Sequence, residues 1–120
     1  MAYISILICV VCTVAGQLML KHATNSLGQM PGNFQDGAIF LIKALLNLYV
    51  IAGFGLAFVA SLAWIAAVSR LELSFAYPFT SLGFVLVLIL SALFFNEPLK
   101  PIRIIGVVTI CTGVYLVSRS

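Results

Sequence analysis

Three polar residues near the end of the first apolar stretch, Thr13, Gln17 and Lys21, have the types and spacing to bind an anion. Four residues turn an α-helix about 40° beyond one full turn, so these side chains form one slowly drifting stripe, with Gly16 beside it for close helix contact. An ammonium group binds phosphate, and a neighbouring amide adds a hydrogen bond. Alternatively, Lys21 only extends its stem to lipid headgroups. Gln17 favours anion binding, because an amide in hydrocarbon needs a partner.

A second group of candidate contacts lies further along the chain. On a helical wheel Ser74, Tyr77 and Ser81 fall within about 60° of one another and form a polar face. Pro78 interrupts the hydrogen bonds of this helix, which occurs at polar cavities and at simple kinks. Trp64 is either an interfacial anchor or a cavity wall. We expect Tyr77, Ser81 and Trp64 to contact the same substrate as the first stripe.

Glu97 is expected at the same depth as Lys21, because each residue lies where an apolar stretch reaches the same side of the molecule. An ion pair between them would be either purely structural or a switch that an arriving phosphate breaks by competing for Lys21. Asn96 and Glu97 directly before Pro98 also fit an N-terminal cap of the next helix. The sequence leaves these alternatives open.

Small residues indicate where helices touch. Gly53, Ala57 and Ser61 are spaced by four, and Gly106 and Gly113 by seven. There is little hydrophobic force between helices in lipid, so small faces are where they associate through close contact. We expect Gly106 and Gly113 to form a dimer seam.

The residue types present argue against catalysis and metal binding. The chain has one histidine, three acidic residues without a cluster and no nucleophile beside a base. Cys9 and Cys12 have redox-motif spacing, but inside an apolar helix they and Cys111 are interpreted as small packing residues. We therefore expect no metal, no cofactor and no enzyme.

The elements that position these residues follow from composition. Of 120 residues, 63% are hydrophobic and only 8% charged, against about 25% charged in soluble domains. The Lys and Arg residues stand singly at the ends of apolar runs, so no basic patch for nucleic acid exists. One bilayer crossing needs about 20 apolar residues. The sequence therefore predicts an all-α membrane protein with four spans and excludes a water-soluble fold.

The whole chain, 1–120, is expected to form one transmembrane domain. Asp36 is expected to cap a short helix that carries Lys43 and lies along the membrane interface before the second span. Short connections force antiparallel neighbours into a compact four-helix bundle with both termini on one side. The expected bounds are 2–22, 47–69, 73–95 and 102–118 for the spans, 23–37 for the loop and 38–46 for the interfacial helix.

The distribution of positive charge predicts the orientation in the membrane. By the positive-inside rule, the side with more Lys and Arg faces the cytoplasm, which leaves the termini outside it. A difference this small also permits insertion both ways round. The counts are four to two: Lys21, Lys43, Lys100 and Arg103 against Arg70 and Arg119.

Several motifs resemble those of a known family. The resemblance to EamA-type drug/metabolite transporters rests on residues 76–83 (AYPFTSLG), 96–99 (NEPL), 105–106 (IG) and 112–114 (TGV). Residues 14–17 (VAGQ) and Lys21 resemble more narrowly the four-helix subunits that flip aminoarabinose-phosphoundecaprenol across the bacterial inner membrane. This resemblance implies that Gln17 and Lys21 form a cationic and amide site for a phosphate.

The related small multidrug resistance family works as an antiparallel dimer and exchanges protons for cations through a glutamate in its first helix. The glycine spacing of its fourth helix is similar to that of Gly106 and Gly113. The first span of this chain has no acidic residue, so it offers nothing at depth to bind a drug cation or a coupling proton.

Three functional hypotheses remain. The leading one is a subunit of a bacterial inner-membrane transporter that flips a polyprenyl-phosphate-linked sugar or a similar anionic glycolipid, as a homodimer or with a sister subunit. The second is an exporter of amines or metabolites of the small multidrug resistance type. The third is a non-transporting membrane partner that assembles or stabilises a larger enzyme or carrier.

Overall fold

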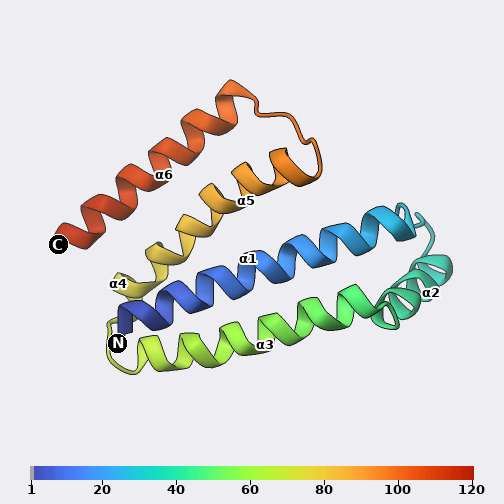
Figure 1. Cartoon of the computed structure of the whole chain (residues 1–120), viewed down its shortest axis with the longest axis horizontal. Helices are drawn as coiled ribbons and strands as arrows, with labels where there is room; N and C mark the ends of the chain where they lie inside the picture. Colours follow the sequence, from blue (N-terminus) through green and yellow to red (C-terminus); the bar gives the residue numbers. More distant parts are fainter. Residues whose placement is uncertain (1) are drawn as a thin grey trace.

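The computed structural model describes residues 2–120, and this range is helical without any strand. Figure 1 shows the helices in chain order. They are α1 (Ala2–Leu27), α2 (Phe34–Leu45), α3 (Leu48–Val68), α4 (Leu73–Ala76), the 3₁₀ helix η1 (Tyr77–Ser81), α5 (Leu82–Phe94) and α6 (Pro101–Arg119).

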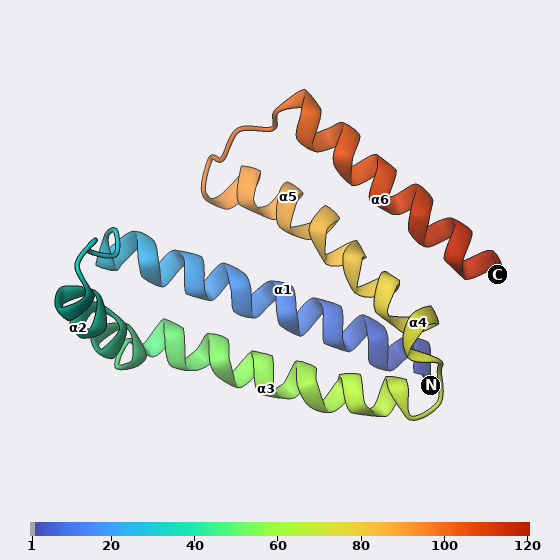
Figure 2. The same ribbon diagram turned by 180° about the vertical axis from the view of Figure 1, so that it is seen from behind.

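Four stretches of the described chain are long and apolar enough to cross a bilayer, which confirms the predicted all-α membrane fold. The third stretch combines α4, η1 and α5, and the others are α1, α3 and α6. Both ends of the chain lie at one end of the long axis and α2 lies at the other, as the two opposite views show (Figures 1 and 2).

The helices α1 and α3 lie antiparallel and side by side, and they form the most extensive helix pair in residues 2–120 (Figure 2). At their crossing, a Cβ atom on Gly16 would lie 2.9 Å from the Gly53 carbonyl oxygen. A Cβ atom on Gly53 would lie 3.0 Å from the Gly16 carbonyl oxygen. Only glycine at both positions lets the two backbones approach this closely. The close contact expected at Gly53 is confirmed, whereas Ala57 and Ser61 of the same predicted face are exposed.

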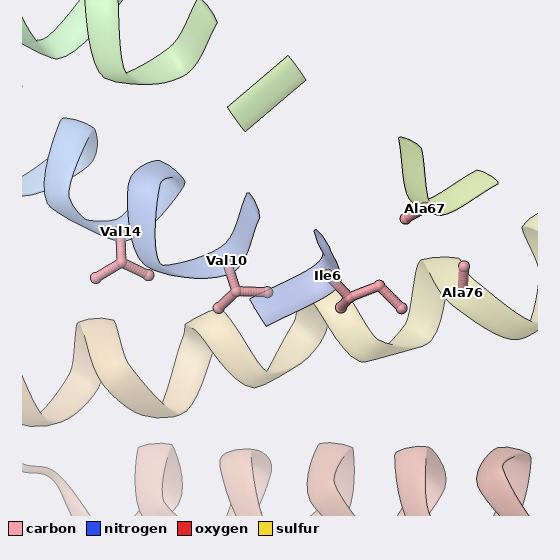
Figure 3. Close-up of a cluster of buried hydrophobic side chains, with 5 residues drawn as sticks. All are labelled: Ile6, Val10, Val14, Ala67 and Ala76. Atoms are coloured by element: carbon pink, nitrogen blue, oxygen red, sulfur yellow. The ribbon is translucent and has the colours of Figure 1, made fainter. Parts of the chain in front are cut away.

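A cluster of buried side chains joins the first two spans to the third (Figure 3). Ile6, Val10 and Val14 are spaced by four, so they share one face of α1, and this face lies over the third span. Ala67 of α3 and Ala76 of α4 complete the cluster at one end. Partly buried apolar side chains pack around it: Leu18, Trp64, Leu71, Phe79, Val87 and Leu90.

The last helix, α6, is mostly exposed. It packs mainly against η1 and α5, and Val114 is its buried residue. The bundle is therefore less compact than the short connections predicted. The physical reason is that an apolar side chain gains little by leaving lipid for another helix. The outer surface of α6 is left free to face lipid or another subunit.

The first helix extends to Leu27, so the interpretation of residues 23–27 as loop was wrong. Weak helix formers are accommodated here because the Thr24 hydroxyl donates to the Lys21 carbonyl at 2.9 Å and the Ser26 hydroxyl to the His22 carbonyl at 3.3 Å. Gly28 ends the helix with a φ of 88°, and its N–H donates to the Thr24 carbonyl at 2.9 Å.

The short helix α2 begins at Phe34, earlier than the expected start at residue 38. Asn33 is its cap: the side-chain oxygen accepts from the Asp36 N–H at 2.8 Å, and the amide donates to the Asp36 carboxylate at 3.0 Å. Asp36 is thus not the cap but lies in the first turn, where the helix dipole favours a carboxylate. The position of α2 along the membrane interface stays a prediction. The remaining helix ends agree with the expected bounds to within one residue.

The third span changes from α-helix to 3₁₀ helix at Tyr77–Ser81, with Pro78 near the start of this segment. Proline has no N–H to donate, which explains the interruption that the sequence predicted. A 3₁₀ helix turns about 120° per residue, so Tyr77 and Ser81 lie about 120° apart and not the 40° of an α-helical wheel. The predicted continuous polar face is therefore split.

The glycine crossing gives a direct stability test. Gly16→Ala places a methyl group against the Gly53 carbonyl oxygen, so we expect the free energy of unfolding to fall by about 1–3 kcal/mol. The measurement is unfolding in detergent, followed by far-UV circular dichroism.

Gly55→Ala is the matched control, because a Cβ atom there meets nothing within 4 Å. Alanine favours helix, so this variant should be as stable as the unmodified protein or more so. Equal stability of the Gly16 and Gly55 variants would contradict the close contact.

Candidate functional site

Lys21 lines a polar hollow of about 600 Å³ where α1 ends and the chain turns toward α2. The side chain is exposed, so its ammonium group is accessible from outside the protein. Hydroxyl, amide and main-chain groups surround it, and Met30 and Phe40 form the apolar part of the wall. Together these groups can hold a phosphate through charge-assisted hydrogen bonds. The polar neighbours of Lys21 are Thr24, Asn25, Gly28 and Gln29.

Thr13 and Gln17 lie on the same helix but outside this hollow. Both are exposed, whereas the adjacent Gly16 is buried against α3. The Gln17 amide makes no hydrogen bond with residues 2–120. The stripe therefore leads from the hollow down an uncovered face of α1.

Trp64 and Tyr77 come together at the other end of the molecule. Their rings meet edge to face, with centroids 5.8 Å apart and an interplanar angle of 80°. Trp64 is half-buried and packs on the core cluster, and Ser81 is half-buried on η1. Of the three residues predicted to contact substrate here, Trp64 and Tyr77 thus pack against each other, across α3 and η1.

The two groups of predicted contacts lie far apart along the membrane normal. Gly16 of α1 lies beside Gly53 of α3. Lys21 is five residues beyond Gly16 and Trp64 is eleven residues beyond Gly53, and the two antiparallel helices lead away from this crossing in opposite directions. At a rise of 1.5 Å per residue this separates them by about 24 Å. Arg70 and Glu72 line another polar hollow, of about 390 Å³, at the end where Trp64 lies. One chain therefore does not bring the predicted contacts into a single site.

Glu97 and Lys21 form no ion pair in the described part of the chain. Glu97 instead lines a hollow between α5 and α6 together with Arg103. The coupling of Glu97 to Lys21 stays a prediction.

Gly106 and Gly113 lie on exposed positions of α6. A Cβ atom at either position meets nothing within 4 Å, so neither glycine is needed for packing within residues 2–120. Gly106 also lines the hollow between α5 and α6, whereas Gly113 does not. Their role as a dimer seam stays a prediction.

Metal ligands do not gather in this structure. Among residues 2–120 no group of three or more His, Cys, Asp or Glu side chains could hold a metal ion. All three cysteines are free.

Sequence reasoning missed the polar neighbours of Lys21. Thr24 and Asn25 were interpreted as loop residues, although they are on the last turns of α1. The signal that could have found them is Gly28, because glycine is the common residue just past a helix end. A helix ending there puts Thr24 and Asn25 three and four residues beyond Lys21, on the same face.

The exposed apolar helices and the charged groups at the span ends define a multi-pass membrane protein with a polar hollow at the mouth of α1. The chain belongs to the EamA-like transporter family, which it matches over residues 1–119. The resemblance seen in the motifs is thereby confirmed.

Two proteins similar to this chain are named as probable flippase subunits. The chain is 35% identical to the probable 4-amino-4-deoxy-L-arabinose-phosphoundecaprenol flippase subunit ArnE of Serratia proteamaculans, covering 97% of this chain and 94% of that protein. It is 33% identical to the probable 4-amino-4-deoxy-L-arabinose-phosphoundecaprenol flippase subunit ArnF of Aeromonas hydrophila, covering 97% of this chain and 78% of that protein. No solved structure matches the chain.

The aromatic pair gives a prediction for the end of the molecule opposite Lys21. Tyr77→Leu removes the edge-to-face contact with Trp64, so we expect a loss of about 0.5–1.5 kcal/mol in the free energy of unfolding. Trp64 is the only tryptophan, so its fluorescence emission should shift as well.

Tyr115→Leu is the matched control, because Tyr115 is similarly exposed on α6 and has no ring contact with Trp64. It should leave the emission spectrum unchanged. An unaltered spectrum in the Tyr77 variant would mean that the rings do not pair.

Proposed function

We propose that this chain is a subunit of a bacterial inner-membrane transporter that flips a polyprenyl-phosphate-linked sugar or a similar anionic glycolipid. The similarity to proteins named as flippase subunits supports this proposal over nearly the whole chain. The chain acts as a carrier component and not as an enzyme.

The observation that carries the proposal is the position of Lys21 in a polar hollow at the end of a span. A lysine that only anchors its helix at the membrane surface needs no amide groups around it. Here Asn25 and Gln29 line the same space, so amide donors stand beside the charge and can form directed hydrogen bonds. That combination suits the phosphate of a lipid headgroup, whose chain stays in the bilayer.

The working transporter contains a second subunit, either an identical chain or a sister protein. Gln17 supports this assembly, because its exposed amide has no partner within residues 2–120 and an unpaired amide in hydrocarbon is costly. A neighbouring subunit that covers the face with Thr13 and Gln17 would turn the stripe into one wall of a polar path. Trp64, Tyr77 and Ser81 would then act at the other end of that path. Gly106 and Gly113 give α6 a small face for the contact.

The exporter hypothesis has less support. Proton-coupled export of cations needs a titratable carboxylate at depth, and α1 contains no Asp or Glu. The acidic residues lie near helix ends, at Asp36, Glu72 and Glu97. The site proposed at Lys21 is positively charged and would bind an anion, whereas such an exporter needs a negatively charged site for a cation.

Removal of the ammonium group tests the proposal. In liposomes that contain the assembled transporter and a polyprenyl-phosphate-linked aminosugar, Lys21→Ala should slow flipping about tenfold or more, because a hydrogen bond to a charged group is lost. The measurement is the accessibility of the lipid headgroup at the outer leaflet over time.

Lys43→Ala is the matched control, because Lys43 is exposed on α2 and does not line the hollow. It should flip at the unmodified rate, and native mass spectrometry should find the same assembly for both variants. An unchanged flipping rate in the Lys21 variant would refute the proposed site.

We also propose that both termini face away from the cytoplasm, with α2 and the Lys21 hollow on the cytoplasmic side. Four of the six Lys and Arg residues lie on that side, namely Lys21, Lys43, Lys100 and Arg103. A C-terminal alkaline phosphatase fusion should be active, and a C-terminal fluorescent fusion that folds only in the cytoplasm should be dark. The reverse result would contradict this orientation, and signal from both fusions would indicate insertion both ways round.

A further inference from the structure

A hollow of about 310 Å³ lies between α5 and α6, on the side of the molecule where the loop 95–100 joins them (Figure 1). Its walls are apolar over most of their length, with Phe84 and Val87 on α5 and Ile110 on α6. Its loop end is polar and carries Ser91, Glu97 and Arg103. The space is thus amphipathic, as a lipid is.

Local geometry holds the charged groups at this polar end. Asn96 has a φ of 54°, which turns the chain sharply after α5 and lets the Glu97 N–H donate to the Ser91 carbonyl at 3.4 Å. Arg103 lies in the first turn of α6, and its Nη1 donates to the Pro98 carbonyl at 3.4 Å. Each contact ties one charged residue to the rim of the same hollow.

The polar side chains at this end of the hollow do not pair with one another. Within residues 2–120 Glu97 and Arg103 form no ion pair, and the Ser91 hydroxyl has no hydrogen-bond partner although Ser91 is only 8% exposed. Glu97 and Arg103 line one space without pairing, and a carboxylate and a guanidinium together are complementary to a ligand with an ammonium and a phosphate. The apolar walls extend seven residues from the polar end on each helix, or about 10 Å, which suits the first part of a hydrocarbon chain.

We propose that this hollow binds a phospholipid of the surrounding bilayer whose headgroup carries a primary amine, such as phosphatidylethanolamine. Arg103 holds the phosphate, Glu97 accepts hydrogen bonds from the ammonium group, and Ser91 donates to an ester or phosphate oxygen. One acyl chain lies between α5 and α6. This site is separate from the Lys21 hollow and goes beyond the proposed flipping function, because it holds a resident lipid that fills the gap between two loosely packed helices.

The test compares lipids that differ only in the headgroup. The full-length protein in detergent is titrated with phosphatidylethanolamine, phosphatidylcholine and phosphatidylglycerol of the same acyl chains, and native mass spectrometry measures the bound fraction. We expect phosphatidylethanolamine to bind about fivefold to tenfold more tightly than the other two, because only its headgroup offers Glu97 a hydrogen-bond donor that is also positively charged. Equal binding of the three lipids would overturn the proposal.

Two charge variants assign the contacts. Glu97→Gln should abolish the preference for phosphatidylethanolamine. Arg103→Gln should weaken the binding of all three phospholipids about tenfold. The matched controls are Glu72→Gln and Lys100→Gln, because neither residue lines this hollow and both are exposed. Retention of the preference in the Glu97 variant, or its loss in a control, would overturn the assignment.

A third variant tests the space itself and does not depend on the charges. Val107→Phe enlarges a side chain that lines the hollow, so it should fill the space and lower binding of every lipid. Val108→Phe is the matched control on the same helix, because Val108 is exposed and outside the hollow. If both phenylalanine variants lower lipid binding equally, the bound lipid lies elsewhere and the proposal fails.

Discussion

The close backbone contact between Gly16 and Gly53 is the constraint on which the rest of the structure depends. Within a bilayer, helices are not driven together by burial of apolar surface, so close contact decides which pairs form. This crossing fixes the register of α1 against α3 and hence the depth of every side chain on both helices. It sets Lys21 toward one membrane face and Trp64 toward the other, and leaves Gln17 on the uncovered side of α1.

The spans were predictable because a stretch of some 20 apolar residues without charge has few alternatives to crossing a membrane. The end of α1 was not, since composition alone suggested a loop after Lys21, whereas side-chain hydrogen bonds from Thr24 and Ser26 and the glycine cap at Gly28 extend the helix. The start of α2 was misjudged for a similar reason: Asn33 and Asp36 are both good cap residues, and only their mutual hydrogen bonds show which one serves.

The sequence could place candidate residues along one helix but could not show how residues of different helices come together. Periodicity puts Thr13, Gln17 and Lys21 on one stripe of α1, because such spacing is a local property, and their role in binding stays a prediction. Which residues from other elements join them depends on helix pairing, which the sequence does not specify. Trp64 and Tyr77 therefore meet each other and not Lys21. The exposure of α6 and of the Gln17 amide is consistent with the proposal that a second subunit covers them.

The length of α1 has a mechanical consequence. Its 26 residues extend about 39 Å, whereas the 21 residues of α3 extend about 32 Å, close to the roughly 30 Å hydrocarbon thickness of a bilayer. Because the two helices are locked together at one crossing, tilting cannot fit both lengths to the same slab. The surplus turn of α1 must protrude on the side of α2. The height of the Lys21 hollow above the hydrocarbon should therefore depend on the thickness of the bilayer.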